Sequence, residues 1–261
     1  MASFASTRSS IDATEYVAYL GRLAKAHRAV QHPYLTALAE GTLPDPRWAL
    51  QDFARHYIAY SAHFPRYLTT VISRLESHAQ RAALLANLTE ESGTYDDAEF
   101  EALRDVGVER EWIEGIPHPQ LFRRFSAALG VQPEDMPEAD AAVCWREMFL
   151  SVLSHGTPAE AVGALGLGTE NIVSTIYGAF VSALSRLDDL APRDTVFFPL
   201  HTAVDDHHQA TLEAISADFA ASPAGREGLR RGMLKALQLR SAFWDWLLER
   251  AQAPARAAVS A

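Results

Sequence analysis

The sequence predicts an all-helical protein, and two observations carry that prediction. Apolar residues recur at spacings of three and four along almost the whole chain, as they do on the buried face of an amphipathic helix. Alternating stretches rich in Val, Ile and Thr, which would indicate strands, are missing. With 261 residues and 48% hydrophobic content the chain can bury a sizeable core. We therefore expect one domain over 1–261, with flexible ends at 1–12 and 253–261.

In the first part of the chain, helical periodicity is broken only by short polar or proline-containing stretches. Pro65 lies well inside the third periodic segment, and an interior proline removes a backbone hydrogen bond and kinks the helix. We therefore expect a bend near Pro65. The helices expected here span 13–28, 33–40, 46–75 and 78–91.

An acidic, polar stretch between Glu91 and His118 interrupts this pattern, with one short helical piece expected at 98–105. Loops of this length in compact domains are often lids or specificity elements. The helices expected beyond it span 119–129, 137–154, 159–185, 196–217 and 225–252. The most apolar of them, 159–185, contains Glu160 and Glu170, and a carboxylate at its centre is costly in lipid. It is therefore predicted to be a buried helix and not a membrane span.

Composition and charge exclude several classes of partner. The net charge is −10 and the basic residues are scattered, so no surface for a nucleic-acid backbone is predicted. The single cysteine, Cys144, excludes an internal disulfide and a thiolate-only zinc or iron-sulfur site, and we expect it to be a buried small apolar side chain. The N-terminal residues lack the apolar segment of a secretory signal. These features favour a cytoplasmic protein with no nucleic-acid or membrane partner.

The most informative pattern is His201, Asp205 and His208, a His-x3-Asp-x2-His array within an expected helix. Offsets of four and three residues place the three side chains on one helical face, where imidazole and carboxylate can bind one cation. The competing interpretation is an aspartate that pairs with neighbouring histidines on a solvated face. The apolar residues around the array, Phe197, Phe198 and Leu212 among them, favour a packed helix and therefore the metal site.

Glu170 is the second indication, because it is flanked by small and aliphatic residues. A buried carboxylate is neutral, salt-bridged or bound to a metal. The alternative to a metal is a buried ion pair with an arginine such as Arg55 or Arg146.

Two further segments complete a set of six candidate ligands. Glu90 and Glu91 end an expected helix, and His118 follows the acidic insertion. With one glutamate of the pair counted, the set contains three carboxylates and three imidazoles. Three negative charges nearly neutralise two divalent cations, and mixed nitrogen and oxygen ligands suit iron or manganese better than zinc, magnesium or calcium.

The chain resembles the haem-oxygenase-like di-metal oxidases, relatives of the thiaminase II (TenA) and pyrroloquinoline-quinone synthase (PqqC) group. The resemblance runs from about residue 32 to 217 and is carried by HPYLTALAEGTL, FARHYIAYSAHFPRYL, NLTEESG, HPQLFRRFSAALG, GTENIV and FFPLHTAVDDHH. It implies a helical bundle of about seven to nine helices. It also implies a ligand set of Glu91, ranked ahead of Glu90, with His118, Glu170, His201, Asp205 and His208. One departure is that many members place the histidine only a few residues after the first glutamate, whereas His118 here follows a long insertion.

The resemblance implies two ferrous ions per chain, or manganese in their place, that activate O2 to oxidise a small organic substrate. Members cleave carbon-carbon bonds of amino acids or fatty acids, or oxygenate amine nitrogens. Glu170 and Glu91 are the expected catalytic carboxylates, with Glu170 bridging the metals, and a homodimer is compatible with the resemblance.

Other functions remain open at this level. A metal-free enzyme of the same fold, of the quinone-synthase or thiaminase type, would use the same six groups as acids, bases and hydrogen-bond donors. Haem oxygenase itself would need an axial histidine such as His27 or His32, and an interaction module would use the Trp-rich last helix. A ferritin-like bundle is excluded because its Glu-x2-His motifs are missing.

Overall fold

Every secondary-structure element in the described part of the chain is a helix, which confirms the all-α prediction. The structure is a computed structural model that describes residues 12–132 and 137–259, with the side chains of 203–208 and 254–259 outside the description. Most of the predicted N-terminal flexible end therefore lies outside the described residues. Asp12 is described, and its side chain accepts a hydrogen bond from the Thr14 amide and caps the first helix.

The first part of the chain folds close to the predicted ranges. The predicted helix 46–75 is two helices with a break at Ala62 and His63, just before Pro65, which agrees with the bend expected there. Asp45 caps the first of the two through the Trp48 amide. The helices are α1 (Ala13–Lys25), α2 (Pro33–Glu40), α3 (Pro46–Ser61), α4 (Phe64–Arg74) and α5 (His78–Glu91).

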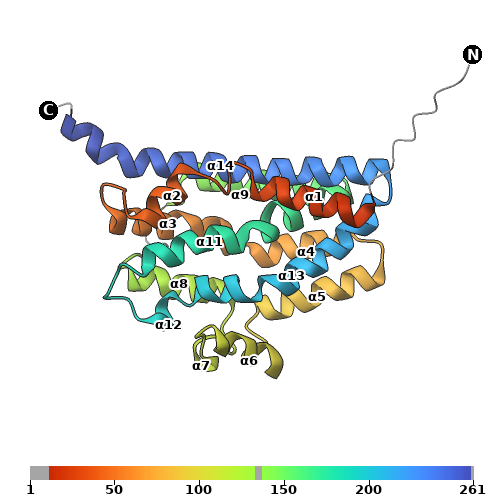
Figure 1. Ribbon diagram of the computed structural model, residues 1–261, viewed down its shortest axis with the longest axis horizontal. Coiled ribbons are helices and arrows are strands. Elements are labelled where there is room, and N and C mark those ends of the chain that lie inside the picture. Colours follow the sequence, from red (N-terminus) through yellow and green to blue (C-terminus); the bar gives the residue numbers. More distant parts are fainter. Residues whose placement is uncertain (1–11, 133–136, 260–261) are drawn as a thin grey trace, which may run out of the picture.

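The acidic insertion contains two short helices, α6 (Asp97–Asp105) and α7 (Arg110–Ile113), which project beyond α5 in Figure 1. Asp96 and Glu99 form a reciprocal capping box that starts α6. The insertion closes on itself at its base, where the Gly115 amide donates to the Gly93 carbonyl at 2.8 Å. The chain therefore leaves the bundle and returns to it at nearly the same point.

The second part of the chain is divided more finely than predicted. The predicted helix 159–185 consists of α10 (Pro158–Val162), a wider π-helix η2 (Gly163–Glu170) and α11 (Asn171–Leu184). Four-residue helices such as α7 and α12 (Pro192–Thr195) are too short for periodicity to reveal, so the described helices exceed the seven to nine expected. The others are α8 (His118–Ala128), α9 (Asp140–His155), α13 (Phe197–Ala220) and α14 (Pro223–Val259). α14 continues past its predicted end at residue 252.

The long helix α14 runs along the bundle and packs closely on α10 and η2 (Figure 1). Glycines make this approach close: a Cβ on Gly163 would lie 2.2 Å from the Leu229 carbonyl oxygen, and one on Gly232 would lie 1.9 Å from the Glu160 carbonyl oxygen. η2 is completely buried and ends at Glu170. A π-helix places one more residue in each turn than an α-helix, and such segments are frequent at functional sites. This segment therefore sets the direction in which Glu170 leaves the backbone.

Two sequence expectations about the surface can be compared with the structure. No helix in the described ranges has the length and apolarity needed to span a bilayer. Cys144 is exposed on α9, so its predicted burial is wrong. Cys144 lies on the exposed side of this helix, whose buried residues include Trp145 and Phe149.

Candidate metal centre

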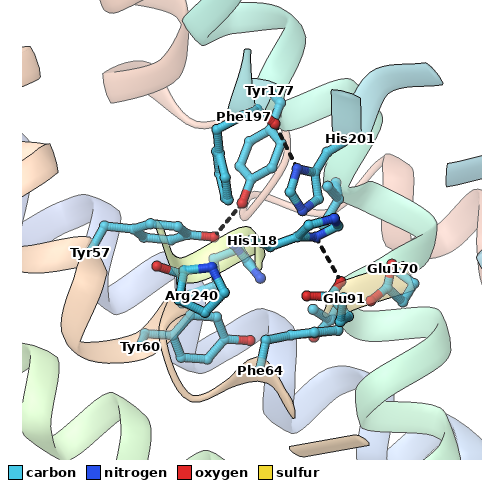
Figure 2. Close-up of a pocket in the computed structure, with 14 residues that line it drawn as sticks. Tyr57, Tyr60, Phe64, Glu91, His118, Glu170, Tyr177, Phe197, His201 and Arg240 are labelled. Carbon is cyan, nitrogen blue, oxygen red and sulfur yellow. Dashed lines mark hydrogen bonds and ion pairs between the residues drawn. The ribbon is translucent and has the colours of Figure 1, made fainter. Parts of the chain in front are cut away.

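A cavity inside the bundle collects side chains from α3, α4, α5, α8, η2, α11, α13 and α14. The volume of this cavity is about 30 Å³, room for about two water molecules. Acidic and imidazole groups occupy one part of its wall, and tyrosines and an arginine occupy another (Figure 2).

Three potential metal ligands meet in this cavity: Glu91, His118 and His201. One donor atom from each lies within 4.8 Å of the others. Glu91 is the last residue of α5, His118 is the first of α8, and His201 lies in the second turn of α13. Glu91 and His118 are each only 4% exposed. His201 is half-buried, so groups that are far apart in the sequence form one largely buried cluster with both oxygen and nitrogen donors.

The imidazole of His118 is held from one side and faces a carboxylate on the other. Its Nε2 is 2.6 Å from the hydroxyl of Tyr95, and its Nδ1 is 3.1 Å from Oε1 of Glu91. The contact with Glu91 is close enough for an ion pair, but Nδ1 makes no aligned hydrogen bond. Burial and the charges of Glu91 and Glu90 raise the pKa of Tyr95, so its phenol stays protonated. A cation bound beside Glu91 would give Nδ1 of His118 a partner.

The imidazole of His201 has a defined tautomer. Its Nδ1 is 2.6 Å from the backbone carbonyl oxygen of Phe197, one turn earlier in α13. Because a carbonyl oxygen only accepts hydrogen bonds, Nδ1 carries the proton and donates it. In the neutral ring the lone pair is therefore on Nε2, the arrangement typical of metal-binding histidines whose other nitrogen bonds a backbone carbonyl.

Glu170 lines the same cavity and is 6% exposed. The arginines considered as alternative partners bond elsewhere: Arg146 contacts Glu138 and Glu147, and Arg55 approaches Asp52. Glu170 is a buried carboxylate in the wall of this cavity, but it is not one of the three residues whose donor atoms lie within 4.8 Å of one another.

Four of the six predicted ligands, Glu91, His118, Glu170 and His201, line one cavity. Asp205 and His208 belong to α13, but their side chains lie outside the described residues. Of the two adjacent glutamates, Glu91 lines the cavity, while Glu90 is equally buried.

Sequence reasoning missed Tyr95, which bonds to His118, and Arg240, which lines the cavity from α14. It also missed the pairing of Tyr57 and Tyr177, whose hydroxyl groups are 2.9 Å apart in the cavity wall. An isolated tyrosine or arginine in a helical sequence carries no periodic signal of such a role. Only the three-dimensional arrangement reveals them.

A family model described as iron-containing redox enzyme matches residues 51–241, which include all six predicted ligands and both tyrosines of the pair. The chain belongs to this family. For an iron-containing redox enzyme the observed donors are suitable, because buried imidazole and carboxylate groups together favour iron over the harder cations. The Nδ1 atom of His118 is buried, makes no hydrogen bond and lies 3.1 Å from a carboxylate oxygen of Glu91. This atom is therefore also suited to bind a metal ion.

Two curated proteins are similar to this chain over most of its length. The 4-aminobenzoate synthase of Chlamydia muridarum is 24% identical over 196 residues, covering 72% of this chain and 74% of its own. The 4-chloro-allylglycine synthase of Streptantibioticus cattleyicolor is 23% identical over 236 residues, covering 88% of this chain and 81% of its own.

Solved structures establish the fold. A protein from Shewanella denitrificans with a haem-oxygenase-like fold superposes with a TM-score of 0.68 at 16% identity, covering 94% of this chain and 95% of its own. A TenA homologue from Pseudomonas syringae gives the same TM-score and identity, covering 92% and 95%. The predicted haem-oxygenase-like, TenA-like helical bundle is therefore confirmed.

Proposed function

We propose that this chain is a non-haem di-iron oxidase or oxygenase that uses O2 to oxidise a small organic substrate. The observation that supports it best is the cluster of Glu91, His118 and His201, whose donor atoms lie within 4.8 Å of one another. Expected substrates are an amino acid, an amine or a fatty acid, and expected reactions are carbon-carbon cleavage or N-oxygenation. The proposal includes a cytoplasmic location and is compatible with a homodimer.

In this proposal six residues hold two Fe2+ ions, with manganese as a substitute: Glu91, His118, Glu170, His201, Asp205 and His208. Iron, when bound, supplies the electrons that reduce O2. Three carboxylates nearly balance the charge of two divalent ions, which lowers the cost of burying them. Glu91 and Glu170 are the proposed catalytic carboxylates, and Glu170 is the proposed bridge.

The protein's own residues orient and shield the cluster. The Phe197 carbonyl keeps the proton of His201 on Nδ1, and Tyr95 holds the ring of His118 from the side opposite Glu91. Tyr57, Phe64 and Val173 line the cavity with apolar surface, which limits the water that reaches the cluster. Exclusion of water strengthens electrostatic interactions inside the cavity and protects reactive species from side reactions.

The names of the two relatives favour a substrate of limited size. The 4-aminobenzoate synthase and the 4-chloro-allylglycine synthase are named for small amine-bearing acids. A cavity with room for about two water molecules is consistent with a small substrate, whose entry would require some side-chain movement.

Metal loading and O2 uptake test the proposal. Protein stripped with a chelator is loaded with Fe2+ without oxygen, desalted, analysed for iron, and mixed with O2 in an oxygen-electrode cell. We expect about two irons per chain, O2 consumption and a transient visible absorbance band. Trace iron with no colour would contradict the proposal and favour the metal-free quinone-synthase-like or thiaminase-like enzyme. The exposure of Cys144 on α9 offers no support for the thiaminase type, which would need a thiol in the cavity.

Variants sharpen this test. Glu170→Ala and Asp205→Ala are each expected to abolish O2 consumption while the circular dichroism spectrum remains helical. Glu160→Ala is the matched control, because Glu160 is also 6% exposed but pairs with Lys235 and Arg231 away from the cluster. Full O2 consumption by Glu170→Ala would refute the role given to this residue.

A further inference from the structure

Arg240 is a completely buried arginine on α14. It is 1% exposed, and its guanidinium carbon lies 5.1 Å from the ring centre of Trp145 and 5.5 Å from that of Tyr60. These two rings stack on each other at 3.8 Å, so they form a rigid aromatic support beside the guanidinium. The position of the charge is therefore well defined.

The guanidinium of Arg240 is incompletely paired. Its Nη1 is buried and makes no hydrogen bond, and no carboxylate whose side chain the structure describes forms an ion pair with Arg240. Other partly buried arginines are paired: Arg146 with Glu138 and Arg250 with Asp52. A buried charge without a counter-charge is costly, and arginine remains protonated in proteins. An anion that enters the cavity would remove this cost.

The location of Arg240 connects it to the candidate metal centre. It lines the same cavity as Glu91, His118 and His201. In Figure 2 it lies beside Tyr57 and Tyr60, with Glu91 and Glu170 on the opposite side of the view. A small molecule held at one end by Arg240 would therefore present its other end to the carboxylate and imidazole groups.

We propose that Arg240 binds the carboxylate of the substrate, so that the substrate is a small organic acid oriented with its acid group away from the proposed irons. This inference rests on the proposed function and deepens it. The planar guanidinium matches a carboxylate in shape and charge. A monoanionic carboxylate suits the site better than phosphate, because a second negative charge would be repelled by the nearby Glu91 and Glu170.

Binding of simple acids to the metal-free protein tests the inference. Butanoate and benzoate are compared by isothermal titration calorimetry with their uncharged amides, butanamide and benzamide, and with inorganic phosphate. We expect each acid to bind at least about tenfold more tightly than its amide, the size expected for a hydrogen bond to a charged group. Equal binding of acid and amide, or phosphate binding as tight as the acids, would overturn the inference.

Variants identify the residue responsible. Arg240→Gln is expected to lose the preference for acids while binding the amides as before, and Arg240→Lys, which keeps the charge but not the planar fork, should retain part of it. Arg146→Gln is the matched control, because Arg146 is also largely buried but pairs with Glu138 outside the cavity, and it should bind acids like the wild type. An unchanged preference for acids in Arg240→Gln would exclude this residue. If Arg240→Gln does not fold, the inference is tested by the comparison of acid and amide in the wild type and by the titration of Arg240→Lys.

The outcomes separate this inference from the proposed function, because the titrations use protein without metal. A preference for acids in a chain that takes up no iron supports the Arg240 site and contradicts the di-iron proposal. Iron uptake and O2 consumption without a preference for acids contradict the Arg240 site alone.

Discussion

At the scale of single residues, the two described imidazoles of the cluster are oriented by partners that are not themselves metal ligands. His201 donates to the Phe197 carbonyl and His118 bonds to Tyr95. Such partners fix the ring orientation and the tautomer, and their loss commonly lowers metal affinity about 10- to 100-fold. The partner of His201 is a backbone carbonyl, whereas the partner of His118 is the side chain of Tyr95, which can be removed by mutation.

Tyr95→Phe is expected to lower the affinity for Fe2+ about 10- to 100-fold, because it removes the hydroxyl that holds Nε2 of His118 and keeps the ring. Competition with a chromophoric chelator under anaerobic conditions measures this change. Tyr19→Phe is the control, because Tyr19 is 44% exposed on α1, and it should bind iron like the wild type. Unchanged affinity in Tyr95→Phe would show that the hydrogen bond does not orient a ligand.

At the scale of elements, the long insertion does not separate Glu91 from His118. The Gly115 amide bonds to the Gly93 carbonyl at its base, and His118 Nδ1 lies 3.1 Å from Glu91 Oε1. Gly93 has a φ of +85°, and a Cβ there would lie 2.5 Å from the Ile116 nitrogen. Gly93 therefore allows the two chain segments at the base of the insertion, around residues 93 and 116, to lie in contact.

Gly93→Ala is expected to be destabilising through both the positive φ and the clash, and to weaken iron binding. Gly107→Ala measures the effect of the positive φ alone, because Gly107 has a φ of +83° and a Cβ there would have no atom within 4 Å. We expect Gly107→Ala to cost about 1–2 kcal/mol and Gly93→Ala about 1–3 kcal/mol more, from denaturant unfolding. Equal stability of the two variants would contradict the close contact between Gly93 and Ile116 at the base of the insertion.

A second connection between elements joins α3 to α14 through Asp52 and Arg250. Both carboxylate oxygens of Asp52 accept from the Arg250 guanidinium, at 2.6 and 2.8 Å, and Asp52 is 1% exposed. Burial alone would raise the pKa of Asp52, but hydrogen bonds from Arg250 and His56 outweigh it and hold the pKa below its ordinary value. A carboxylate with a depressed pKa contributes stability above the unfolded value and loses it as the pH falls through the folded value.

Asp52→Asn should therefore lower the melting temperature by several degrees at pH 7, since a loss of about 1–3 kcal/mol is expected for these charged hydrogen bonds. The difference from the wild type should shrink as the pH falls below about 4, because the unfolded chain then binds a proton at Asp52 while the folded carboxylate, with its lowered pKa, is still ionised. Melting curves from pH 7 to pH 3 measure it. Asp189→Asn, which breaks the exposed pair with Arg47, should leave the melting temperature nearly unchanged. A constant difference at all pH values would contradict the ionic role of Asp52.

At the scale of the whole molecule, the sequence predicts the helices and much of the candidate site. α2 and α5 match their predicted bounds because polar or proline-containing stretches delimit them. Glu170 stood out as a carboxylate in an apolar helix, and it lies in the cavity. The π-helix before it was not predicted, because one extra residue per turn leaves no mark on apolar periodicity.

The residues that sequence reasoning missed depend on contacts between distant segments. Arg240 is one of many scattered arginines, and only the packing of α14 against η2 and α9 brings it into the cavity. On the sequence alone, nothing distinguishes it from Arg55 or Arg146. Tyr95 meets His118 because the insertion returns to its starting point, which the sequence does not reveal.

The central claim is that the buried carboxylate and imidazole groups of this cavity bind iron. Crystals of the iron-loaded protein, measured on both sides of the iron absorption edge, test it directly. Two anomalous difference peaks are predicted in the cavity, within bonding distance of Glu91, His118, Glu170 and His201. Iron peaks elsewhere on the molecule, with none in the cavity, would contradict the claim.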